Sequence, residues 1–186
     1  LPHARSAAIV DCLMALRVYD TLKQKKADFV PVRPGKVGMY VCGMTVQDKP
    51  HMGHMLAFVS GDMIRRYLEY LGYEVTYVQN FTDIDDKIID RANQEGVDYR
   101  AVVERNIEAY HRAAKAVNIK PATIYPYATQ HISEILAMVQ DLVARGHAYV
   151  ASNGDVYFRV RSKKDYGKLS KRDIDDLISG ARVEVG

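Results

Sequence analysis

The sequence predicts an α/β fold that is built on a parallel sheet. Two short apolar runs, residues 37–42 and 74–81, carry the valines, threonine and aromatic residues that are typical of buried strands. Between them, residues 54–72 place apolar side chains at helical spacing and end at Gly72, a residue that favours a helix stop. A strand, a helix and a second strand in this order form a βαβ unit, and the strands of such a unit run parallel.

The spacing of apolar side chains in the first predicted helix is the evidence for it. Residues three and four positions apart lie on the same side of a helix. The apolar positions are Leu56, Val59, Met63, Ile64, Tyr67, Leu68 and Leu71.

Residues 82–96 predict a second helix that ends at Gly96. Thr82 and Asp85, three positions apart, have the form of a capping box at its start. The acidic residues that follow, Asp83, Asp85 and Asp86, could suggest a magnesium site. Carboxylates in a first helical turn also complement the helix dipole, and we favour that interpretation.

The second part of the chain predicts helices and a hairpin. Residues 98–118 and 129–146 are amphipathic, and the two prolines of residues 119–128 prevent one continuous helix. Residues 147–160 form two alternating runs around Ser-Asn-Gly-Asp, which predicts a β-hairpin. A short helix is predicted near residues 172–178. No further strand closes the parallel sheet, so the chain has the pattern of the front part of a larger domain.

Composition narrows the class of protein. The chain has 186 residues, 48% of them hydrophobic, which is enough for a buried core. Its 26 basic and 23 acidic residues give a net charge of +3, too small to indicate nucleic-acid binding by itself. Cys12 and Cys42 provide no disulfide framework, so we expect a reducing, cytoplasmic location. The apolar stretch of residues 7–16 contains Asp11 and is too short to span a bilayer, so no membrane partner is expected.

The stretch YVCGMTVQDKPHMGH, residues 40–54, contains the candidate chemistry. It joins the first strand to the first helix, at the edge of the sheet where ligands of such folds bind. His51 and His54 fall at the helix N-terminus, where free backbone N–H groups and the helix dipole favour an anion. Gly53 has no Cβ, which would let a nucleotide approach the backbone. These features predict a nucleotide phosphate site beside the Cys42 thiol, although a small core cysteine and a connecting loop would also explain them.

These residues also carry a family resemblance. HMGH resembles the His-Ile-Gly-His signature of the class I aminoacyl-tRNA synthetases, with Met52 in place of isoleucine. The longer strings GMYVCGMTVQDKPHMGH, RRYLEYLGYEVTYVQNFTDIDDKII, GHAYVASNGDVYFRV, YGKLSKRDIDDL and GARVEV resemble the cysteinyl-tRNA synthetases specifically. The resemblance covers roughly residues 17–186.

The resemblance implies a Rossmann-like parallel sheet and three parts of the chain. Residues 1–16 would be a leader or an added extension, to which we assign no function. Residues 17–120 would be the first half of the nucleotide-binding catalytic domain, and residues 121–186 a connective insertion with a helix and a β-hairpin.

The resemblance also implies the site residues. Cys42 would bind Zn²⁺, which in turn binds the thiolate of the substrate cysteine, with the other zinc ligands beyond residue 186. Gly43, Thr45 and Thr82 would line the amino-acid pocket, although helix capping explains Thr82 equally well. ATP, with Mg²⁺, would meet His51, Gly53, His54 and Thr45, and the two histidines would stabilise charge on the phosphate during the reaction. The remaining histidines, His3, His111, His131 and His147, lack ligand spacing, so we expect them to be solvated or in the core.

The activity that the resemblance implies is that of a cysteine–tRNA ligase. Cysteine and ATP would form cysteinyl adenylate, from which the acyl group would pass to tRNA(Cys). The chain lacks the Lys-Met-Ser-Lys signature of the family, so we expect it to be inactive alone. We expect a monomer.

One basic cluster could meet the acceptor arm of tRNA through phosphate contacts, or could simply be solvated surface. It consists of Arg159, Arg161, Lys163, Lys164, Lys168, Lys171 and Arg172.

Two other functions fit the motifs. A related ligase would use the same zinc and adenylate chemistry but deliver cysteine to an amino sugar, as in mycothiol synthesis. The other function is that of a truncated module, which would bind a nucleotide or a partner protein without catalysis.

Overall fold

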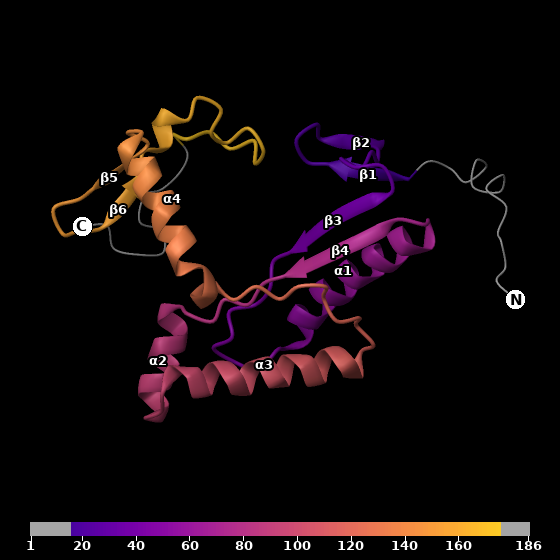
Figure 1. Cartoon of the computed structure of the whole chain (residues 1–186), viewed down its shortest axis with the longest axis horizontal. Coiled ribbons are helices and arrows are strands. Elements are labelled where there is room, and N and C mark those ends of the chain that lie inside the picture. The colour runs from indigo at the N-terminus through magenta and orange to yellow at the C-terminus, as the bar shows by residue number, and fades with distance from the viewer. Residues whose placement is uncertain (1–15, 176–186) are drawn as a thin grey trace, which may run out of the picture. The chain divides into compact units, whose positions relative to one another are not determined.

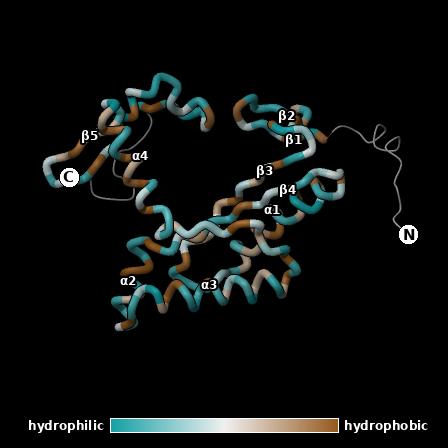
Figure 2. Tube along the Cα trace, viewed as in Figure 1, coloured by the Kyte–Doolittle hydropathy of each residue, from teal (hydrophilic) through white to brown (hydrophobic). Residues whose placement is uncertain are grey.

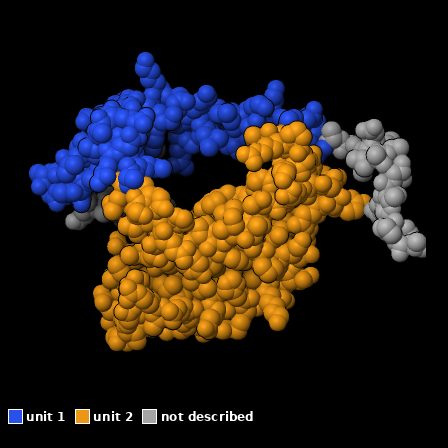
Figure 3. Space-filling model, in the orientation of Figure 1, with its two compact units in different colours: residues 1–30, 137–186 blue, residues 31–136 orange. Residues whose placement is uncertain are grey.

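The computed structural model describes residues 16–175, in two compact units (Figure 3). One unit comprises residues 31–136, and the other comprises residues 1–30 and 137–186. The predicted leader lies outside the described residues except for Leu16, as does the end of the short helix predicted near residue 178. The domain boundaries expected from the sequence stay a prediction.

Unit 2, residues 31–136, is built on the predicted βαβ arrangement (Figure 1). Strand β3 (Lys36–Val41) leads through a loop into helix α1 (Met52–Tyr70), which packs against both strands and leads to strand β4 (Glu74–Gln79). The two strands pair in parallel over their whole length, from Lys36 opposite Glu74 to Val41 opposite Gln79. The prediction of a parallel pair is therefore confirmed.

A third extended segment, residues 123–127, lies in parallel beside β4. The Gln79 N–H donates to the Ile124 carbonyl oxygen at 3.1 Å, and the Phe81 N–H continues the pattern. Phe81 donates to the carbonyl oxygen of Pro126 at 2.9 Å. Proline lacks an N–H but keeps its carbonyl acceptor, so this position is compatible with an edge strand. The proline-containing connection between two helices thus also extends the sheet.

The buried side of α1 is not the side that carries most of its apolar residues. Its buried residues are Met55, Phe58, Gly61, Asp62, Arg65 and Leu68. Only Leu68 of the apolar positions named above is among them, whereas Leu56 and Met63 are 69% and 64% exposed. The predicted helix is therefore confirmed, but its buried side is not its most apolar side.

The physical reason is that polar side chains of α1 hold the segment that follows α3. Arg65 Nη1 donates to the Pro121 carbonyl oxygen at 2.7 Å. The Asp62 carboxylate accepts from the Lys120 N–H at 3.2 Å. Hydrophobic spacing could not reveal these hydrogen bonds, because charged side chains make them with backbone groups that are far away in the sequence.

Helices α2 (Asp86–Glu95) and α3 (Tyr99–Ala116) complete the core of this unit. Helix α2 ends at Gly96 with a φ of 67°, as predicted, but its N-cap is Asp85, whose side chain accepts from the Lys87 N–H at 3.0 Å. The predicted cap at Thr82 is therefore wrong.

The core gathers around the aromatic side chain of Tyr110 on α3. Its ring meets Phe81 and Phe58 edge to face, with ring centroids 5.1 Å and 5.4 Å away. Its hydroxyl accepts from Gln79 Nε2 at 2.8 Å. Burial of the Tyr110 ring stabilises the core, and the buried hydroxyl is not left without a hydrogen-bond partner. Figure 2 shows that hydrophilic and hydrophobic residues alternate along α3.

Unit 1 contains two antiparallel hairpins. Strands β1 (Arg17–Asp20) and β2 (Lys25–Asp28) form a hairpin that the sequence patterns did not predict. Strands β5 (Ala148–Val150) and β6 (Val156–Phe158) form the predicted one. Its turn includes Gly154 at a φ of 89°, a conformation that glycine adopts without strain.

Helix α4 (Ile132–Ala144) follows a 3₁₀ turn at Ala128–His131, so the predicted helix of residues 129–146 is confirmed with shorter bounds. Within residues 16–175, no helix has the length and apolar character needed to cross a membrane.

Candidate functional site

The carboxyl ends of β3 and β4 are joined by the side chain of Asn80. Its Oδ1 accepts from the Gly43 N–H and from the Tyr40 hydroxyl, both at 2.8 Å. Gly43 is also pressed against the backbone of Asn80: a Cβ at position 43 would lie 1.6 Å from the Asn80 carbonyl oxygen. Only glycine fits at such a distance, so the strand ends meet there at backbone contact.

Beyond this contact the two chain segments remain paired. Thr45 and Thr82 form a parallel bridge. The Val46 N–H donates to the Thr82 carbonyl oxygen at 3.3 Å, and the Thr82 N–H donates to the Met44 carbonyl oxygen at 3.2 Å. The structure therefore brings together the predicted residues Cys42, Gly43, Thr45 and Thr82, and Thr82 is a strand-end residue rather than a helix cap.

The loop between β3 and α1 is also anchored from α3. Val46 is fully buried, and its carbonyl oxygen accepts from Asn106 Nδ2 at 2.9 Å. A buried amide that binds a backbone carbonyl fixes the path of a loop more firmly than apolar packing does, because hydrogen bonds are directional.

Cys42 is exposed and carries a free thiol directly after β3. A core cysteine would be buried, so the alternative of a small packing residue does not fit this position. A thiolate is a suitable ligand for Zn²⁺. Among residues 16–175, however, no three His, Cys, Asp or Glu side chains are grouped to hold a metal ion. These residues supply one ligand of the right kind, not a complete zinc site.

His51 and His54 cap the N-terminus of α1 reciprocally. His51 Nδ1 accepts from the N–H groups of Gly53 at 3.1 Å and His54 at 3.4 Å. In return, His54 Nδ1 accepts from the His51 N–H at 3.3 Å. This is the arrangement of a capping box, built from two imidazoles in place of a hydroxyl and a carboxylate.

The cap determines which ring nitrogen of each histidine faces away from the helix. A nitrogen that accepts a hydrogen bond carries no proton, so the proton of each ring lies on Nε2. The rings stack with centroids 3.7 Å apart. Burial, and then the charge of His51, lower the pKa of His54 below its usual 6.5. Each ring therefore presents an Nε2–H donor on the edge opposite to the cap.

One expectation about this helix end needs correction, and Gly53 has an additional structural role. The N–H groups of Gly53 and His54 are occupied by His51 rather than free for an anion. At Gly53 a Cβ would lie 3.0 Å from His51 Cε1, so the missing side chain makes room for the His51 ring.

Of the three acidic residues after β4, Asp85 and Asp86 lie at the start of α2 as predicted, whereas Asp83 has a different role. Asp83 is buried, and its carboxylate accepts from the Thr129 N–H at 3.0 Å and the Thr129 hydroxyl at 2.5 Å. It is not in the first turn of α2, where Asp86 alone stands after the Asp85 cap.

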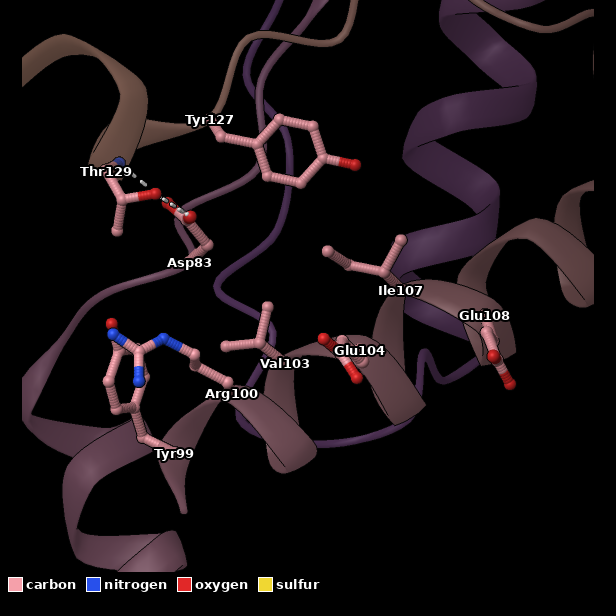
Figure 4. A pocket seen from close by; sticks show the side chains of 9 residues that line it. All are labelled: Asp83, Tyr99, Arg100, Val103, Glu104, Ile107, Glu108, Tyr127 and Thr129. Carbon is pink, nitrogen blue, oxygen red and sulfur yellow. Dashed lines mark hydrogen bonds between the residues drawn. The ribbon is translucent and has the colours of Figure 1, made fainter.

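Asp83 also borders an open pocket of about 440 Å³ (Figure 4). The pocket is lined mainly by α3, with Tyr127 and Thr129 on its other side. None of the residues predicted for the site lines this pocket.

The basic segment, residues 159–172, presents all seven of its cations as exposed side chains. Arg161 pairs with Asp175, and Lys163 pairs with Asp165 at 2.6 Å. Arg159 lies over the ring of Tyr149, 5.0 Å from its centroid. Ion pairs between such exposed side chains contribute little to stability. Because the side chains are exposed, their positive charges remain accessible from solvent.

Sequence reasoning missed two residues of the site, Asn80 and Tyr40. The signal for Asn80 was its place directly after a strand that is parallel to the strand of Cys42. Tyr40 gave no signal, because its exposed ring is unremarkable in a strand.

Comparison with known proteins identifies relatives over most of the chain. Residues 28–186 match the family of tRNA synthetases class I (C) catalytic domain. A cysteine–tRNA ligase of Heliobacterium modesticaldum is 56% identical over 92% of this chain and 36% of its own length. One from Pelobacter propionicus is 55% identical over 92% of this chain and 35% of its own length. The chain thus spans about a third of the length of the curated relatives it matches.

The fold is similar to that of a solved synthetase. A structure of Mycobacterium tuberculosis methionyl-tRNA synthetase in complex with methionyl-adenylate aligns with a TM-score of 0.56 at 23% identity. The alignment covers 61% of this chain and 23% of that one.

Proposed function

The chain belongs to the family of class I (C) tRNA synthetase catalytic domains, and on that premise we propose that it is part of a cysteine–tRNA ligase. The observation that carries the proposal is 56% identity, over 92% of the chain, to a protein of that name. The parallel order of β3, β4 and residues 123–127 supports a Rossmann-like half of a nucleotide-binding domain.

The reaction would proceed in two steps. The carboxylate of cysteine attacks the α-phosphate of ATP, which arrives with Mg²⁺, and pyrophosphate leaves. The terminal ribose hydroxyl of tRNA(Cys) then attacks the acyl carbon of cysteinyl adenylate, and AMP leaves. The substrate supplies its own nucleophile, so the protein contributes chiefly positioning and charge stabilisation.

His51 and His54 would bind phosphate oxygens through their Nε2–H groups. Both Nδ1 atoms are used by the helix cap, which leaves the opposite ring edges as donors. A donor that is already oriented costs no reorganisation when negative charge develops, which favours the transition state. Gly53 and Thr45 complete the proposed nucleotide contacts.

Cys42 would supply one thiolate ligand to Zn²⁺, with the other ligands outside the described residues. When bound, zinc binds the thiol of the substrate and so separates cysteine from serine. Gly43, Thr45 and Thr82, which lie at the same strand ends, would line the pocket for the rest of the amino acid.

The basic segment would meet tRNA through phosphate contacts, since its cations are exposed. A cytoplasmic enzyme agrees with the cysteine usage and with the proposed substrates, and the monomer stays a prediction.

Two assays on the full-length protein that carries this sequence test the proposal. Cysteine-dependent exchange between ATP and pyrophosphate should occur, and labelled cysteine should be transferred to tRNA(Cys). Exchange followed by transfer to an amino-sugar acceptor would instead identify the related ligase. ATP binding without any exchange would contradict both and leave a binding module.

A further inference from the structure

We propose that Asn80 is a positioning residue that sets the relation between Cys42 and Thr82, and thereby the affinity for the substrate amino acid. The inference rests on the proposed function and deepens it. Asn80 does not itself contact the substrate: it acts through the two strand ends that it joins.

The amide of Asn80 can adopt only one orientation. Its Oδ1 accepts two hydrogen bonds, from the Gly43 N–H and the Tyr40 hydroxyl. An amide oxygen has two lone pairs, so both are used. Rotating the amide by half a turn would bring its NH₂ group against the Gly43 N–H, donor against donor. The network therefore fixes which side of Asn80 faces each neighbour.

The other side of the amide faces Thr82. Nδ2 donates to the Thr82 hydroxyl oxygen at 3.5 Å. Because that oxygen accepts from Asn80, the Thr82 hydroxyl proton remains available for a different acceptor, such as a bound amino acid. One side chain thus orients the Thr82 hydroxyl and the peptide that directly follows Cys42.

Backbone contact makes this arrangement sensitive. Gly43 lies so close to Asn80 that no Cβ fits between them. Groups that are packed at backbone contact cannot shift independently of one another. Removal of the Asn80 amide should therefore move both strand ends together. The histidine cap of α1 is held by its own hydrogen bonds, none of which involves Asn80.

The test compares how one substitution in the full-length protein changes the Michaelis constant for cysteine and the Michaelis constant for ATP. Asn80→Ala should raise the KM for cysteine about tenfold, which corresponds to the removal of one ordinary hydrogen bond. The KM for ATP should stay within about twofold, because the phosphate-binding histidines keep their cap. A cysteine KM within about twofold of wild type, or equal rises in both constants, would overturn the inference.

Two further variants separate the arms of the network. Asn80→Asp keeps the oxygen acceptor for Gly43 but removes the donor to Thr82, so its cysteine KM should lie between those of wild type and Asn80→Ala. Tyr40→Phe removes only one of the two donors to Asn80 Oδ1 and should raise the cysteine KM by less than Asn80→Ala does.

Amide hydrogen exchange gives a readout that does not depend on activity. The peptide that contains Gly43 should exchange faster in Asn80→Ala than in wild type and in Asn80→Asp. An unchanged exchange rate would show that Asn80 does not hold this strand end, and the inference would fail. If the wild-type protein shows no cysteine-dependent exchange of pyrophosphate, the proposed function fails, and the Gly43 amide alone decides the positioning role.

Discussion

The carboxyl ends of β3 and β4 and the basic segment place functional side chains in opposite ways. At the strand ends, Asn80 bonds two neighbours at 2.8 Å, and Gly43 allows backbone contact. In the basic segment the cations are exposed and pair with carboxylates at the surface. The function of the strand ends depends on the position of each atom, whereas that of the basic segment depends on its total charge. A single substitution should therefore have a much larger effect at the strand ends than in the basic segment.

The largest effect is expected at the histidine cap. His51→Asn or His54→Asn in the full-length protein should lower kcat for pyrophosphate exchange by about 10²–10³-fold, as when one oriented donor is removed. His131→Asn changes a histidine that is outside this cap and should leave kcat unchanged. Activity near the wild-type value in both cap variants would exclude the proposed role of the Nε2–H donors.

The second-largest effect is expected for a substitution of Gly43. Gly43→Ala places a Cβ against the backbone of Asn80, and the strain should lower the free energy of unfolding by about 1–3 kcal/mol. Gly38→Ala is the matched control on the same strand, because a Cβ there meets nothing within 4 Å. Urea unfolding measures both, and equal stabilities would contradict the close approach of the two strand ends.

Cys42→Ser tests the metal and the selectivity together. Zinc content by mass spectrometry should fall, because a serine hydroxyl is a much poorer ligand than a thiolate. The preference for cysteine over serine should then decrease to what shape alone provides, about 1–3 kcal/mol. Cys12→Ser is the control and should keep its zinc. Unchanged zinc and unchanged rejection of serine in Cys42→Ser would refute the assignment.

A smaller effect, on tRNA binding rather than on stability, is expected for substitutions in the basic segment. Replacing Lys164 and Lys168 by Gln should weaken tRNA binding and reduce its salt slope by about one for each phosphate that is no longer bound. The free energy of unfolding should change by less than about 0.5 kcal/mol, because both side chains are exposed. A fall in stability without a change in salt slope would assign these lysines to structure instead.

The smallest effect is the pH dependence of stability. Burial lowers the pKa of His54 and His111 in the folded state below the usual 6.5. As pH falls through 6.5, the unfolded chain binds protons more readily, so the free energy of unfolding should decrease; above about pH 7.5 it should be flat. Urea unfolding from pH 7.5 to 5.5 measures this slope. It should be shallower in His54→Asn, and an identical slope would show that the cap does not lower the His54 pKa.

Local patterns in the sequence predicted most elements of the fold. Residues 37–42 and 74–81 correspond to β3 and β4, and the Ser-Asn-Gly-Asp turn to the β5–β6 hairpin, since strand alternation and turn chemistry are local properties. The Cys42-Gly43 and His51–His54 positions of the candidate site followed from one continuous stretch of sequence.

The sequence by itself therefore determined the βαβ order, the hairpin and the residue types at the site. Only the tertiary structure decided which side of α1 is buried, that Thr82 forms a bridge with Thr45 instead of capping α2, and that Asn80 joins the two strand ends. The reason is physical: each of these depends on hydrogen bonds between groups that are distant in the chain. Periodicity and propensity describe a residue with its near neighbours, and they contain no record of such distant partners.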